Sequence, residues 1–80
     1  MMNAKEMFES IEYYLIEETK ERVVYKNVDD YIVFDNRHEL VHRYRLANLP
    51  GDYKTKLPMA LTYNELRAIN QQAKELKWYD

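Results

Sequence analysis

The sequence predicts an α+β fold in which a three-stranded antiparallel sheet is flanked by N- and C-terminal helices, in the order α-β-β-β-α. Three observations predict this fold: helical apolar spacing at both ends of the chain, β-branched and aromatic runs in its middle, and short polar turns between those runs. The chain has 80 residues, enough for one domain, which we assign to residues 1–80.

The first helix is predicted to begin after Asn3. The side chain of Asn3 can accept a hydrogen bond from the first helical turn, and Glu6 follows three residues later. One helical stripe then contains Ala4, Met7, Phe8, Ile11, Tyr14 and Leu15. This spacing predicts a helix that runs to about Lys20. Tyr13 and Ile16 lie off the stripe, so they either widen the buried face or leave an apolar patch for a partner.

The middle of the chain is rich in residues that favour strands. Strands are expected at residues 23–25, 31–34 and 40–46, separated by polar residues that favour turns, at 27–30 and at 35–36. The run 31–34 is apolar on both faces, which indicates a central strand covered on each side.

The third expected strand alternates in polarity. One face would carry Leu40, His42, Tyr44 and Leu46, and the other Glu39, Val41, Arg43 and Arg45. Because the first set is the more apolar, we expect it to face the core. Arg43 and Arg45 would then lie in solvent or pair with the acidic first helix.

Residues 48–60 are predicted to be the longest irregular segment. Pro50 followed by Gly51, the one glycine of the chain, is typical of a tight turn. Residues 57–61 can form an extended run, which Pro58 would restrict to a sheet edge.

The second helix has the clearest predicted start. Thr62 and Glu65 match a capping box, in which each side chain accepts a hydrogen bond from a backbone N–H group at the helix start. The apolar face of this helix is expected to contain Leu66, Ile69, Ala73 and Leu76. Trp78 follows and is expected to cover the core.

Charge is segregated along the chain, although the net charge is only −2. Residues 1–21 contain six glutamates and two lysines, whereas residues 37–56 contain five basic and two acidic residues. The two segments can simply face each other. The absence of cysteine, of a signal peptide and of a long apolar run predicts a cytoplasmic protein without a membrane partner.

The sequence offers little equipment for catalysis. The single serine, Ser10, lies within the predicted first helix, and the chain has no cysteine and no glycine-rich loop. His38 and His42 lie on or beside a strand, where their spacing separates the α-carbons by roughly 13 Å, too far for a shared metal. We therefore expect no enzymatic activity, no metal and no cofactor.

One basic cluster could meet a polyanion, and it consists of Arg37, Arg43, Arg45, Lys54 and Lys56. Arginine and lysine can bind phosphates, so weak nucleic-acid binding around Arg43 and Arg45 is one interpretation. Alternation, however, puts Tyr44 on the face opposite those arginines, and the sequence pI of about 5.7 is low for a nucleic-acid-binding protein.

The interpretation we rank first is a protein-interaction or regulatory module, acting on an unknown protein or as a homodimer. A three-stranded sheet has open edges, and aromatic residues near an edge favour partner binding. The candidate contact residues are Tyr13, Ile16, Tyr63 and Tyr79.

The segment 61–69, together with Glu75, Leu76, Lys77 and Trp78, resembles the terminal helix of many small bacterial and prophage-borne proteins. This resemblance covers about a quarter of the chain, and the capping box alone accounts for much of it. It implies a small accessory protein of a bacterium or its phage, and it transfers no site residues.

Overall fold

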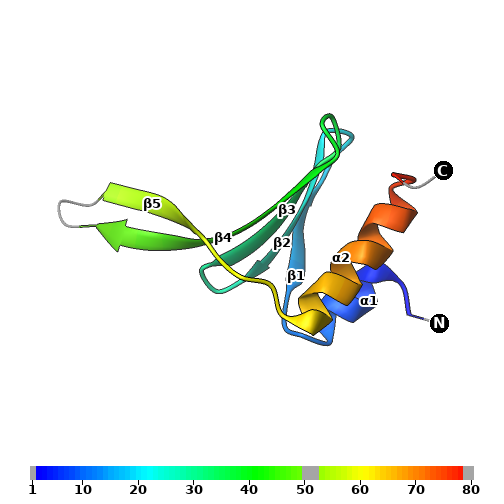
Figure 1. Cartoon of the computed structure of the whole chain (residues 1–80), viewed down its shortest axis with the longest axis horizontal. Coiled ribbons are helices and arrows are strands. Elements are labelled where there is room, and N and C mark those ends of the chain that lie inside the picture. Colours follow the sequence, from blue (N-terminus) through cyan, green and yellow to red (C-terminus); the bar gives the residue numbers. More distant parts are fainter. Residues whose placement is uncertain (1, 50–52, 79–80) are drawn as a thin grey trace.

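The computed structural model describes residues 2–49 and 53–78. The elements are α1 (Ala4–Glu9), β1 (Tyr14–Glu18), β2 (Arg22–Asn27), β3 (Asp30–Asp35), β4 (Leu40–Leu49), β5 (Tyr53–Pro58) and α2 (Tyr63–Glu75). The strands form one antiparallel sheet in chain order, β1-β2-β3-β4-β5 (Figure 1). The α+β class with two terminal helices is confirmed, but the prediction of three strands is wrong, because the sheet has five.

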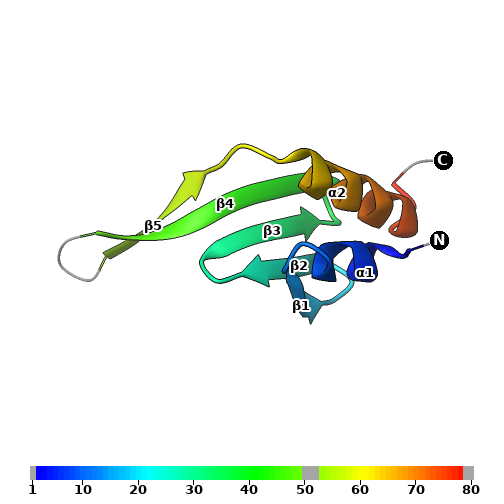
Figure 2. The same ribbon diagram turned by 90° about the horizontal axis from the view of Figure 1, so that it is seen from below.

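Both helices lie on the same side of the sheet (Figures 1 and 2). The strand register aligns Val23 with Phe34, and it aligns Tyr25 with Ile32 and Arg43, so these side chains share one face. This face, which meets α1 and α2, is called the covered face below. The opposite face is called the open face.

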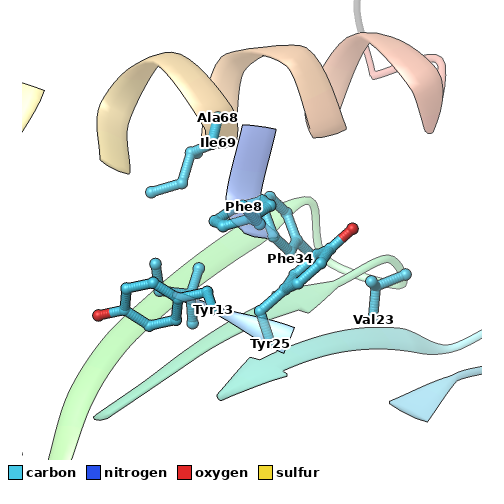
Figure 3. Packing of buried hydrophobic residues seen from close by; sticks show 8 residues of the cluster. Phe8, Tyr13, Val23, Tyr25, Phe34, Ala68 and Ile69 are labelled. Atoms are coloured by element: carbon cyan, nitrogen blue, oxygen red, sulfur yellow. The ribbon is translucent and has the colours of Figure 1, made fainter. Parts of the chain in front are cut away.

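Aromatic rings dominate the core between the sheet and the helices. Phe8 of α1 stacks on Tyr25 of β2 with ring centroids 3.9 Å apart, and Phe34 meets both rings edge to face. Figure 3 shows Phe8 between these sheet residues and Ile69 of α2. Aromatic pairs add specific geometry to a large buried area, which allows a short chain to build a defined core.

Helix α1 begins as predicted and ends about ten residues early. Asn3 and Glu6 form the expected capping box. The N–H of Glu12 bonds to the carbonyl of Glu9, and the N–H of Tyr13 bonds to the carbonyl of Phe8, which is the bond pair of a Schellman motif. Glu12 supplies the left-handed residue at φ 66°. The prediction of a helix to Lys20 is therefore wrong, because α1 ends at Glu9. The sequence does not indicate this end, since glutamate takes the left-handed position that glycine usually occupies.

Helix α2 begins and ends by the same two devices. Thr62 and Glu65 form the predicted capping box. At the other end, Lys77 takes φ 63°, and the N–H of Trp78 bonds to the carbonyl of Ala73. The left-handed turn brings the indole of Trp78 against Phe34, so the predicted lid over the core is confirmed.

The two strands that the sequence interpretation missed lie at the edges of the sheet. β1 occupies residues that were assigned to the first helix, and β5 occupies part of the segment expected to be irregular. β5 pairs with β4 from Tyr44 to Leu49 only. The two form an arm that projects away from the helices (Figure 1). The turn predicted at Pro50 and Gly51 lies outside the described residues.

The orientation predicted for β4 is wrong. Arg43, expected in solvent, lies on the covered face, and its side chain is only 11% exposed. His42 and Tyr44, expected in the core, lie on the open face, where His42 is exposed. The predicted alternation is correct, but the choice of face is reversed. Arg43 can lie on the covered face because Asp30 and Glu65 pair with it there.

Candidate functional site

The open face of the sheet has no helix packed on it (Figures 1 and 2). By register and alternation it contains Glu17, Arg22, Val24, Lys26, Tyr31, Val33, Asp35, Leu40, His42, Tyr44, Leu46 and Lys56. Antiparallel sheets often have one face packed on the core and one solvated face with polar side chains. This one mixes aromatic and apolar side chains with basic and acidic ones.

A ladder of four side chains crosses the open face. The rings of Tyr31 and Tyr44 are stacked with centroids 5.2 Å apart and planes 12° apart. The Nζ of Lys26 lies 5.5 Å from the centroid of Tyr31, and the Nζ of Lys56 lies 4.8 Å from that of Tyr44. The two ammonium groups therefore flank the ring pair, each in a cation–π contact.

Beside this ladder lies a hollow of about 410 Å³. Its lining comes from four strands, from the loop between β1 and β2 and from the loop between β3 and β4: Glu21, Arg22, Val33, Asp35, Arg37, His38, His42, Tyr44 and Lys56.

Two of the charged groups are held by neighbours on the same face. Arg22 forms a bidentate pair with Glu17, in which Nε and Nη2 donate to the two carboxylate oxygens. Asp35 accepts the backbone N–H groups of Arg37 and His38 on Oδ1, and its Oδ2 lies 2.9 Å from His38 Nδ1. The bond to His38 lowers the pKa of Asp35, and these contacts use both of its oxygens.

A second charged cluster lies on the covered face and is buried. Glu65 Oε2 accepts the hydroxyl of Tyr13 at 2.7 Å and Arg43 Nη2 at 3.3 Å, while Oε1 accepts the Thr62 N–H. Burial raises the pKa of Glu65, but the hydrogen bonds from Thr62, Tyr13 and Arg43 together lower it by more. The pKa of Glu65 is therefore below its ordinary value. One carboxylate thus joins α2, β4 and the segment between α1 and β1.

Asp30 completes this cluster. It accepts Arg45 Nε at 2.7 Å, and its Oδ1 lies 3.4 Å from Arg43 Nη1, an ion-pair distance without hydrogen-bond alignment. The bond from Arg45 is the main cause that lowers the pKa of Asp30. The positive charges of Arg43 and Arg45 are therefore matched by carboxylates within the fold.

The structure separates the residues predicted to contact a polyanion. Arg37 and Lys56 line the hollow on the open face, whereas Lys54 lies farther along β5 and does not line it. Arg43 belongs to the buried cluster on the covered face, whereas Arg45, whose side chain is 50% exposed, pairs with Asp30 at the edge of that cluster.

The residues predicted to contact a protein are also dispersed. Tyr13 is only 3% exposed, because it packs on Phe8 and bonds to Glu65. Of the two alternatives for Tyr13, the wider buried face is therefore the correct one, and Tyr13 does not form part of an exposed patch. Ile16 is exposed at an irregularity of β1, and Tyr63 is exposed at the start of α2. Tyr79 lies outside the described residues.

The sequence interpretation overlooked Lys26 and Tyr31 on the open face. The sequence contained a signal for the tyrosine pair, because two adjacent strands each carry a tyrosine. Tyr31 and Tyr44 can be recognised as cross-strand neighbours once the register of β3 and β4 is known. The register of β2 and β3 depends on the two-residue loop between them, in which Val28 has φ 53°. This left-handed conformation is rare for valine, so the sequence does not predict it.

Within the described part of the chain, no group of three or more histidine, aspartate or glutamate side chains could hold a metal ion. Neither helix in residues 2–49 and 53–78 has the length and apolarity required of a membrane span.

No protein-family model matches the chain, and no similar curated protein or solved structure is found.

Proposed function

We propose that the chain is a non-enzymatic protein-binding module, which docks an acidic surface of a partner protein on its open face. One observation carries this proposal: α1 and α2 both pack on the covered face, and no described element covers the other side of the sheet (Figure 2). A sheet face that mixes aromatic and apolar side chains stabilises a complex when a partner removes it from water.

The composition of the open face supports a protein partner. Tyrosine and arginine are enriched in the buried centres of protein interfaces. The open face offers Tyr31 and Tyr44 in one cross-strand row and Arg22 two rows away, with Val33 in the row between them. The tyrosine pair is already packed in the free chain. Binding there would cost little side-chain entropy.

Charge supports an acidic partner. Lys26, Arg37 and Lys56 form no ion pair with a carboxylate of the described residues, whereas Glu17 and Asp35 are each engaged by a basic neighbour. The open face therefore has a surplus of unpaired cations, although the whole chain has a net charge of −2. Complementary charge speeds association and selects among partners.

The geometry favours a protein over a nucleic acid. Single-stranded nucleic acids bind by stacking bases on exposed aromatic faces. The facing sides of Tyr31 and Tyr44 are covered by each other, and an ammonium group flanks each ring. Nucleic-acid binding through Arg43 and Arg45 stays a prediction, and their pairing with Asp30 and Glu65 gives it little support.

Charge reversal on the open face tests the proposal. The double variant His42→Asp/Lys56→Glu replaces two exposed residues of the open face, and Lys74→Glu on α2, which reverses one charge on the helix side, is the control. Immobilised wild-type chain and control should capture an acidic protein from a lysate, identified by mass spectrometry. In titrations with that purified protein, the double variant should bind at least about tenfold more weakly, through lost attraction and new repulsion.

Equal binding by the double variant and the control would overturn the assignment of the open face, provided that circular dichroism shows all variants folded. Light scattering addresses the homodimer interpretation. A dimer that the double variant dissociates would show that a second copy of this chain occupies the open face, in place of an acidic partner.

A further inference from the structure

The hollow on the open face brings basic groups from separate elements to one place. Arg22 comes from β2, Arg37 and His38 from the loop after β3, His42 from β4 and Lys56 from β5. Side chains so distant in the sequence converge only because the strands pair in this register. Convergent polar groups in a hollow of about 410 Å³ are typical of a binding site for a small chemical group.

The donors of the hollow are largely unused. The guanidinium of Arg37 and the imidazole of His42 have no hydrogen bond or ion pair with any described residue. The ammonium group of Lys56 lies over the ring of Tyr44 and forms no ion pair with the described carboxylates. Arg22 is held in place by Glu17 through Nε and Nη2, which leaves Nη1 for a ligand. A fixed guanidinium loses less entropy when it binds than a free one does.

Two acidic residues line the same hollow, and they differ. Both carboxylate oxygens of Asp35 form hydrogen bonds with the loop after β3, one with the imidazole of His38 and the other with two backbone N–H groups. Glu21 forms no side-chain hydrogen bond or ion pair with the described residues, so its carboxylate opposes an anion. A ligand must therefore carry enough negative charge to outweigh Glu21.

We propose that this hollow binds a phosphate monoester carried by the partner, such as a phosphorylated side chain. A phosphate monoester has a charge of about −1.5 to −2 and three terminal oxygens, which suits several donors arriving from different strands. A carboxylate has one charge and two oxygens, too few for this set of donors. This inference rests on the proposed function, because it names the chemistry that the docking partner presents to the open face.

Nuclear magnetic resonance titration of the full chain with inorganic phosphate tests the inference. At constant ionic strength, phosphate should shift the backbone amide signals around Arg37, His42 and Tyr44 in a saturable manner. Acetate should bind at least about tenfold more weakly, since it has less negative charge and one oxygen fewer to accept charge-assisted hydrogen bonds.

Variants of opposite sign make the test specific. Lys56→Gln should weaken phosphate binding about fivefold, and Glu21→Gln should strengthen it about twofold because it removes the opposing charge. Lys74→Gln on α2 changes the net charge by the same amount as Lys56→Gln and should leave binding unchanged.

Three outcomes would overturn the inference: no saturable shift with phosphate, equal binding of acetate, or equal effects of Lys56→Gln and Lys74→Gln. Tighter binding of a single-stranded oligonucleotide than of phosphate at the same signals would assign the hollow to nucleic acid. Failure here leaves the docking of an acidic protein intact if the charge-reversal experiment succeeds, so the two proposals fail separately.

Discussion

At the scale of single residues, Arg43 has the most unusual position in the chain. It lies in the register of core residues Tyr25 and Ile32, yet it is a cation with its side chain 11% exposed. Glu65 and Asp30 compensate its charge, although Nε has no hydrogen-bond partner among the described residues. A buried cation is tolerated only while its partners remain, because an unpaired buried charge is costly.

Replacing Arg43 by methionine should therefore destabilise the fold strongly. The Arg43→Met variant keeps a similar side-chain volume but leaves Glu65 buried with one partner fewer, so the free energy of unfolding should fall by about 3 to 5 kcal/mol. Urea denaturation measures this loss. Arg37→Met at the exposed loop is the control and should change stability by less than about 0.5 kcal/mol. A small loss for Arg43→Met would mean that the cation contributes nothing to the fold.

The same cluster predicts how stability depends on pH. The pKa values of Asp30 and Glu65 are lower in the folded chain than their ordinary values of 3.8 and 4.5. The folded state is thus favoured while both groups are ionised, and this contribution is complete above about pH 4.5 and lost as pH falls through the folded pKa values. In urea denaturation, the stability advantage of wild type over Asp30→Asn should be large at pH 7 and should shrink as pH is lowered below 3.8. A constant difference between the two proteins would contradict the predicted ionisation of Asp30.

At the scale of elements, the ends of both helices follow one design. Each begins with a capping box that the sequence displays, and each ends with a charged residue in the left-handed conformation, Glu12 or Lys77. The left-handed conformation usually calls for glycine, and the one glycine of this chain lies elsewhere. Helix starts were therefore predictable and helix ends were not.

The orientation of α2 differs by one position from the predicted apolar face. Ile69 is 7% exposed, whereas Leu66 is 42% exposed, because Glu65 and Gln72 occupy buried positions with Tyr13 and Tyr25 as hydrogen-bond partners. The sequence interpretation assumed that polar residues lie outside the core, so it placed Leu66 in the core in the position that Glu65 occupies.

Truncation of these two residues separates the orientations. Ile69→Ala should lower the free energy of unfolding by about 2 to 5 kcal/mol, through lost burial and a cavity against the sheet. Leu66→Ala should cost less than about 1 kcal/mol, since its side chain is already in partial contact with water. Thermal or urea denaturation of the two variants measures both values, and equal losses would contradict the observed orientation of α2.

At the scale of the whole molecule, the chain is elongated, with extents of 45 × 27 × 20 Å. The arm made by β5 and the outer half of β4 accounts for much of the long axis (Figure 1). Helices cover β2 and β3 through Tyr25 and Phe34, whereas β5 has only β4 as a sheet partner. Stability should accordingly be unequal along the sheet.

Amide hydrogen exchange measured residue by residue should reveal this gradient. The backbone N–H groups of β2 and β3 should exchange only through global unfolding, because both their neighbours and the helices protect them. Those of β5 should exchange by local opening, with protection at least about tenfold lower. Equal protection in β3 and β5 would indicate that something else stabilises the arm.

The capping boxes at Asn3 and Thr62, the positions of the three central strands and the polarity alternation of β4 could all be predicted from the sequence. These features are local, because each depends on residues within a few positions of one another. The face of β4 that meets the helices could not be predicted in this way, because it depends on contacts between distant parts of the chain. The choice of face turned on Asp30 and Glu65, which neutralise Arg43 from distant parts of the chain, and it placed His42 and Tyr44 with Lys26 and Lys56 on the open face. Because side chains of a strand alternate between two faces, the sequence shows which of them share a face. Whether that face lies in the core or in solvent depends on the residues that pack on it from other parts of the chain.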